Sequence, residues 1–166
     1  METALVIVIE DAEPFDVVRR ELMPATVAAG IPFHVTLLSP FGELVNEARA
    51  FFAERKPFDF ALTRVAAWPR VVYLVPEPDD ELRALMSALF ARFPEWPPYG
   101  GIHDEVIPHA TLGEEVDAAT VRDEIERRVA PHLPFRCQAR DVSLLEEYAP
   151  GRWRERQRFP LCGQHA

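Results

Sequence analysis

Apolar residues in the first half of the chain change their spacing at regular intervals, and each spacing indicates one kind of secondary structure. Continuous apolar runs and strict alternation are typical of strands, whereas apolar positions three and four residues apart are typical of helices. The first half is therefore predicted to contain a strand at 4–9, a helix at 15–23, a strand at 34–39, a helix at 44–52 and a strand at 58–62. Pro24 and Pro57 are expected to end the two helices.

The second half of the chain repeats this order of elements. The predicted elements are a strand at 71–75, a helix capped by Asp79 or Asp80 that runs to Phe93, a strand at 109–113, a helix at 117–129 and a strand at 134–139. A last strand is expected at about 152–159. The order strand, helix, strand, helix, strand thus occurs twice, which indicates an internal duplication.

This pattern predicts an α+β fold in a single domain, 1–166. Two lobes, about 1–70 and 71–166, would each be too small to be stable alone, so they are expected to pack together around a pseudo-twofold axis. Each lobe is expected to have an antiparallel-type sheet with helices on its outer face. The cleft between the lobes is the expected ligand site.

One short motif occurs in both halves. HVTLL at 34–38 is followed 75 residues later by HATLG at 109–113, in a chain that has only 5 histidines. Thr accounts for 6 and Leu for 15 of the 166 residues. With independent positions, a doubled His-x-Thr-Leu motif arises by chance roughly once in ten thousand such compositions. Duplication or function is left to explain it.

The motif places an imidazole and a hydroxyl on the same side of each strand. Side chains of a strand point alternately to its two faces, so His34 and Thr36 are expected to share one face, and His109 and Thr111 likewise. If the lobes are related by a twofold axis, the four side chains converge on one place. Two imidazoles and two hydroxyls form a suitable site for a tetrahedral anion.

Two histidines beside a phosphodiester indicate acid–base chemistry without a metal. A neutral imidazole takes a proton from the attacking oxygen, and an imidazolium gives a proton to the leaving oxygen. An ordinary histidine pKa of ~6.5 allows both forms at neutral pH. The threonine hydroxyls are expected to donate hydrogen bonds to the non-bridging oxygens, where negative charge grows in the transition state.

Other interpretations of the motif stay open. The histidines are also compatible with core positions on strands that were duplicated by ancestry. A catalytic zinc takes three protein ligands, so a metal site would need a third ligand from His103, Asp104 or Glu105; we expect no metal and no other cofactor. A module that binds a nucleotide or an RNA end without turnover would use the same anion site.

HVTLLSPF and PHATLG resemble the paired His-x-Thr motifs of the 2H phosphoesterase superfamily, and nearly the whole chain resembles the bacterial 2′-5′ RNA ligase and RNA 2′,3′-cyclic phosphodiesterase (LigT-like) family. The resemblance implies hydrolysis of 2′,3′-cyclic phosphates, on RNA ends or nucleotides, to 2′-phosphates. It implies His34 and His109 as the acid–base pair, in unassigned roles, and Thr36 and Thr111 as phosphate ligands. The alternative activity is 2′-5′ RNA ligation, and some relatives open ADP-ribose cyclic phosphates or cut 2′-5′ oligoadenylates.

Further substrate contacts are predicted outside the two motifs. Phe41 and Tyr99 flank them in the sequence and are candidates to stack on a base. Arg152, Arg154, Arg156 and Arg158 alternate along RWRERQRF, so on a regular strand they share one face, with Trp153 and Phe159 on the other. That face is either a strip that tracks phosphates or a solvated surface paired with acidic side chains.

Composition limits the partners of the protein. A formal charge of −9 argues against sequence-independent binding of long nucleic acids, but it allows a small anion in a local pocket. No stretch approaches the ~20 apolar residues of a membrane span, so a soluble, cytoplasmic protein is expected, with no obligate protein partner evident. Cys137 and Cys162 are expected to be reduced structural thiols.

Overall fold

The computed structural model describes residues 2–101 and 105–163. Its strands in these ranges form one antiparallel sheet in the order β6-β3-β4-β5-β2-β1-β7-β8. The strands are β1 (Thr3–Val8), β2 (His34–Leu38), β3 (Phe58–Trp68), β4 (Val71–Glu77), β5 (Ala110–Glu114), β6 (Phe135–Ala139), β7 (Asp141–Ala149) and β8 (Arg152–Pro160). The helices are α1 (Glu13–Leu22), α2 (Pro24–Ala28), α3 (Val45–Ala53), α4 (Asp80–Arg92) and α5 (Ala118–Val129), with 3₁₀ turns η1 (Pro98–Gly101) and η2 (Ala130–His132). None of the described helices is long and apolar enough to span a membrane.

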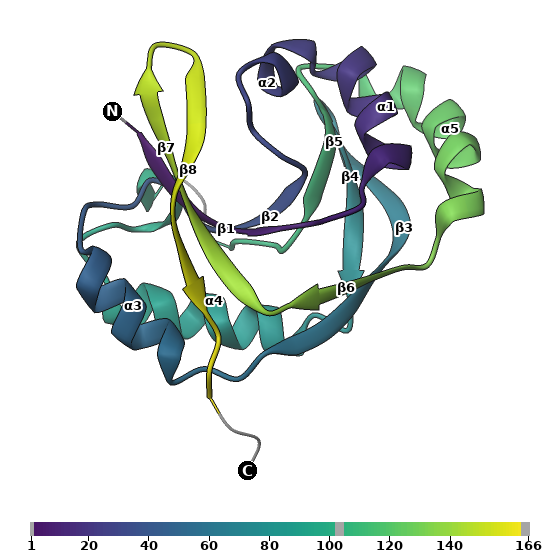
Figure 1. Ribbon diagram of the computed structural model, residues 1–166. Helices are drawn as coiled ribbons and strands as arrows, with labels where there is room; N and C mark the ends of the chain where they lie inside the picture. The colour runs from purple at the N-terminus through teal and green to yellow at the C-terminus, as the bar shows by residue number, and fades with distance from the viewer. Residues whose placement is uncertain (1, 102–104, 164–166) are drawn as a thin grey trace.

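Four of the helices cover the outer side of the curled sheet (Figure 1). Helices α1 and α5 pack against β5 and β3, whereas α3 and α4 pack against β8 and β2. The side chains between the helices and the sheet form one buried cluster, in which Phe15, Phe52, Phe93 and Phe159 are fully buried. Since both pairs of helices contribute to this one cluster, the opposite face of the central strands is left uncovered by them.

The elements expected from the sequence are present, with ends displaced by a few residues. Three differences have physical reasons. Pro24 begins the short helix α2, because the missing N–H of proline is harmless in a first turn. Strand β3 continues to Trp68, because the hairpin with β4 pairs it from Ala61 to Trp68. Strand β7 was not predicted, because Val142 to Leu145 are buried on both faces and show no alternation.

The prediction of one sheet per lobe is wrong, because a single sheet runs through the whole molecule. Strands β2 and β5 are joined at its centre through Val35 and Ala110. Strand β3, from the first half of the chain, pairs with β4 and β6 from the second half. The two halves therefore share their strands, and the internal duplication with its pseudo-twofold axis stays a prediction.

Candidate active site

The two His-x-Thr motifs lie on the two neighbouring strands at the centre of the sheet. His34, Thr36, His109 and Thr111 line one cavity of about 290 Å³. Their aliphatic neighbours in the motifs are buried in the core on the other face. The alternation of a strand thus acts as predicted, and the pairing of β2 with β5 brings the four side chains together.

Both imidazole rings are held in the same way. Nδ1 of His34 donates a hydrogen bond to the carbonyl oxygen of Pro32 at 2.7 Å, and Nδ1 of His109 donates to that of Ile107 at 2.7 Å. A carbonyl oxygen can only accept, so Nδ1 carries the proton and Nε2 is the basic nitrogen of each neutral ring. Nε2 of His34 is 3.1 Å from the Thr36 hydroxyl. Each ring thus has a basic nitrogen available for proton transfer.

Aromatic rings fix the orientation of His109. Trp68 and Tyr73 pack edge-on against its imidazole, with centroid distances of 4.9 and 5.5 Å. A second, mostly apolar cavity of about 460 Å³ begins on this side of the ring, lined by Trp68, Val71, Tyr99, Glu105, Val106, Ile107 and His109. His109 therefore lines both this apolar cavity and the first one, hereafter the polar cavity, which also has charged and hydroxyl side chains in its lining.

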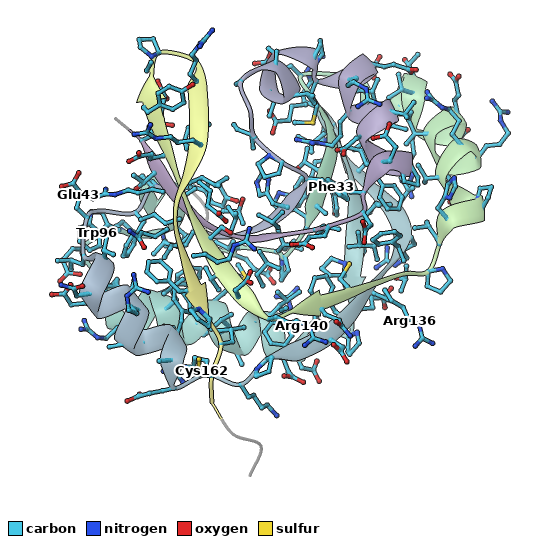
Figure 2. The ribbon with its side chains drawn as sticks, in the orientation of Figure 1. Phe33, Glu43, Trp96, Arg136, Arg140 and Cys162 are labelled. Atoms are coloured by element: carbon cyan, nitrogen blue, oxygen red, sulfur yellow. The ribbon has the colours of Figure 1, made fainter. Side chains whose placement is uncertain are left out.

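Arg19 of α1 is a cavity residue that the sequence interpretation missed. It is 2% exposed, and it is the only arginine or lysine among the described residues that line the polar cavity. Its guanidinium pairs with Asp16 at 2.9 Å, donates to the Ile31 carbonyl at 2.8 Å and lies 5.7 Å from the ring of Phe33, which is labelled in Figure 2. Its Nε has no hydrogen-bond partner in the described structure. The sequence signal was an arginine four residues after Phe15, on the apolar face of its helix.

The cavity keeps both imidazoles in their neutral form. Burial lowers the pKa of His34 to about 4; the hydrogen bond to Pro32 opposes this change, and the charges of Arg19 and His109 add to it. Burial also lowers the pKa of His109. An anion bound between the rings would raise both pKa values, because it stabilises the imidazolium form. The site is therefore suited to take up a proton together with an anion.

The two aromatic candidates have different places. Tyr99 lines both cavities and is hydrogen-bonded to Thr36, and burial raises the pKa of its phenol. Phe41 is buried in the core, where its ring centroid lies 5.2 Å from that of Phe93 and 5.1 Å from that of Trp96. Tyr99 thus lies where a ligand can reach it, and Phe41 does not.

The prediction that the four arginines of β8 share one face is wrong. Glu155 faces Leu145 of β7, and Gln157 faces the adjacent Leu144. The register therefore shifts between Glu155 and Gln157, and Arg156 has no opposite residue on β7. An extra residue of this kind reverses the alternation of a strand. Phe159 therefore packs in the main core, whereas Trp153 packs on the other face near Ala4, Val6 and Leu145.

Most of these arginines are engaged by acidic side chains. Arg154 pairs with Glu146 at 2.9 Å, Arg158 with Glu155 at 3.0 Å, and Arg156 with Glu43 and Glu146 at 3.8 Å each. Neither Arg152 nor Arg154 lines the polar cavity, although Trp153 between them does. The arrangement matches the alternative of a solvated, charge-paired surface.

The remaining candidates are the alternative metal ligands at 103–105 and the two thiols. His103 and Asp104 lie outside the described residues, and Glu105 pairs with Arg83 at 3.5 Å. In the described part of the chain, no three His, Cys, Asp or Glu side chains are grouped to hold a metal. Cys137 is buried, which raises its pKa to about 12, and Cys162 is exposed; both are free thiols.

Comparisons with known proteins agree with this arrangement. A protein of Geobacillus thermodenitrificans (strain NG80-2), named "Putative phosphoesterase", is 26% identical over 148 residues, covering 81% of this chain and 81% of that protein. E. coli LigT in its apo form superposes with a TM-score of 0.66 at 21% identity, covering 98% of both chains. TT0787 of Thermus thermophilus has a TM-score of 0.61 at 19% identity, covering 99% of this chain and 100% of that one. These structures have the same fold.

The model of one protein family matches most of the chain. It describes the 2′-5′ RNA ligase superfamily, and it matches residues 8–150, which include both motifs and the strands that carry them. The fold, the two strand motifs and this match agree, and the chain belongs to the 2′-5′ RNA ligase superfamily.

Proposed function

We propose that the protein is a metal-independent phosphoesterase that hydrolyses 2′,3′-cyclic phosphates, on RNA ends or nucleotides, to 2′-phosphates. The observation that carries this proposal is the pair of imidazoles at the start of β2 and directly before β5. Each has its proton on Nδ1 and lies in one cavity with two threonines and a buried arginine. The relatives support a small phosphate ligand, since E. coli LigT has been crystallised with 3′-AMP and with phosphate.

The proposed step is an attack of water on the phosphorus atom. Nε2 of one neutral histidine accepts a proton from the water as the new P–O bond forms. The other histidine, protonated together with the binding of the anion, gives its proton to the 3′ oxygen as the bond from that oxygen to phosphorus breaks. The product has a 2′-phosphate and a 3′-hydroxyl. Thr36, Thr111 and Arg19 stabilise the charge on the non-bridging oxygens.

The experiment is a product analysis with 2′,3′-cyclic nucleotides and with oligonucleotides that end in a cyclic phosphate, in the presence of EDTA. We expect nucleoside 2′-phosphates from the wild type, and a loss of about 10²–10⁴ in rate for His34→Ala and for His109→Ala. His132→Ala is the matched control, because this exposed histidine in η2 does not line the cavity. Full activity of either cavity variant would refute the two-histidine mechanism.

The family description favours 2′-5′ RNA ligation as the second candidate. Ligation would join a 2′,3′-cyclic end to a 5′-hydroxyl end with the two histidines in the same roles. The base would take the proton of the 5′-hydroxyl as its oxygen attacks the phosphorus atom in place of water, and the acid would protonate the leaving 3′ oxygen. The same assay separates the candidates when a 5′-hydroxyl oligonucleotide is added, because a 2′-5′ linked product then appears. Binding of these ends without any product would instead indicate a module without turnover.

A further inference from the structure

The sixth position of each motif also reaches the polar cavity. Ser39 and Glu114 each lie five residues after the histidine of their motif, and both line the cavity with the histidines and threonines. In a regular strand, residues three apart, such as Thr111 and Glu114, point to opposite faces. An irregularity in the strand must therefore bring Glu114 to the side of Thr111.

The register of β5 contains that irregularity. Thr111 faces Tyr73 and Gly113 faces Val72, so Leu112 has no opposite residue on β4. The extra residue reverses the alternation, places Gly113 on the core side and turns Glu114 to the cavity. A Cβ atom at Gly113 would lie 2.9 Å from Leu22 of α1, so the glycine allows this helix to approach β5.

The first motif has the same feature. Thr36 faces Val6 and Leu38 faces Leu5, so Leu37 has no opposite residue on β1, and Ser39 reaches the cavity. The two sixth positions nevertheless differ in charge, since one is a neutral hydroxyl and the other a carboxylate. Of the two sixth positions, only Glu114 therefore brings a charge to the cavity.

The cavity has an unusual charge balance for a site that binds an anion. Arg19 is its fixed cation, and Glu114 and Glu2 are its carboxylates among the described residues. Glu114 is exposed, yet enough protein surrounds its carboxylate that desolvation raises its pKa; the charge of Glu115 adds to this effect and that of Arg19 opposes it. At pH 8 a phosphate group in the cavity therefore has one positive neighbour, Arg19, and Glu114 is one of the two carboxylates that oppose it.

We propose that Glu114 is a specificity-determining residue, which makes the cavity favour a phosphodiester monoanion over a phosphomonoester dianion. This inference rests on the proposed function. The cyclic substrate carries one negative charge, whereas the 2′-phosphate product carries two at a pH above its second pKa of about 6. Repulsion from a fixed carboxylate doubles when the charge of the ligand doubles. Glu114 thereby weakens the binding of product more than that of substrate, and it favours product release.

The test compares two ligands that share one nucleoside at the same pH. Adenosine 2′-phosphate is a dianion at pH 8, whereas its methyl diester, adenosine 2′-(methyl phosphate), is a monoanion. Calorimetric titrations of both ligands are made with the wild type, with Glu114→Gln and with Glu115→Gln. Glu115 is the matched control, because it is the exposed neighbour of Glu114 and does not line the cavity.

We expect Glu114→Gln to bind the dianion about tenfold more tightly and the monoanion about threefold more tightly, because the repulsion scales with the charge of the ligand. Glu115→Gln should match the wild type for both ligands. Progress curves with the cyclic substrate should show stronger product inhibition in Glu114→Gln. Equal gains for the two ligands, no gain, or weaker binding of both would overturn the proposal.

The binding test also separates this proposal from the proposed function. Wild-type protein that turns over no cyclic phosphate would refute the proposed function, while the titrations would still report the charge selectivity of the cavity. Conversely, the wild type could turn over cyclic phosphates while Glu114→Gln keeps the wild-type preference for the monoanion over the dianion. That result would refute the role of Glu114 and leave the proposed function standing. Thermal unfolding of each variant checks that the exposed substitutions leave the fold intact.

Discussion

The neutral state of His34 has a measurable consequence for the stability of the fold in mild acid. Burial lowers its pKa from 6.5 to about 4 in the folded protein, whereas the unfolded chain keeps the ordinary value. Between these two values the unfolded chain binds a proton that the folded chain does not bind. The free energy of unfolding must therefore decrease as the pH falls below 6.5, and this decrease is complete below about pH 4.

The two pKa values give the size of this effect. A difference from 6.5 to about 4 corresponds to a total loss of about 3 kcal/mol, of which about 2 kcal/mol is already lost at pH 5. Substitution by asparagine removes the titrating ring while keeping a side-chain donor near the Pro32 carbonyl. The stability of His34→Asn relative to the wild type should therefore improve by about 2 kcal/mol from pH 7.5 to pH 5.

Urea denaturation followed by circular dichroism measures this change. The free energy of unfolding is determined for the wild type and the variant at both pH values, and the difference between the two differences isolates His34 from the other titrating groups. His132→Asn reports the background, because it removes an exposed imidazole outside the cavity. Parallel stability curves for His34→Asn and the wild type would show that burial does not hold this imidazole neutral.

Three further predictions concern the cavity and its supports. Thr36→Ala and Thr111→Ala should each lower kcat while KM changes little, because each loses about 2–4 kcal/mol of transition-state stabilisation. Steady-state kinetics on a cyclic nucleotide measures both constants. A rise in KM alone would mean that the hydroxyls only position substrate. Gly113→Ala places a methyl group 2.9 Å from Leu22, so it should displace α1 together with Arg19. We expect the free energy of unfolding, measured by urea denaturation, to fall by about 1–3 kcal/mol, and we expect kcat/KM to fall as well. Wild-type values for both quantities would contradict the packing argument. Activity should persist in EDTA, and a loss that a divalent ion restores would favour a metal mechanism.

The sequence by itself determined the features that depend on local periodicity. The alternation of HVTLL and HATLG is sufficient to place each histidine beside its threonine on one strand face, because side-chain direction in a strand depends only on position along it. The order of most strands and helices followed from the same kind of pattern. Strand β7 was not predicted, because burial on both faces removes the alternation of apolar and polar residues on which such a prediction depends.

The tertiary structure decided what depends on pairing between distant segments. Arg19 enters the cavity only because α1 packs against β5, and nothing in the periodicity of a helix says what lies opposite its apolar face. Single extra residues in the ladders turn Glu114 into the cavity and separate the arginines around Arg156. Such bulges arise from the register between two strands, and a one-residue change of register reverses every side chain beyond it. The sequence therefore determined the reacting groups, and only the folded sheet decided which charges surround them.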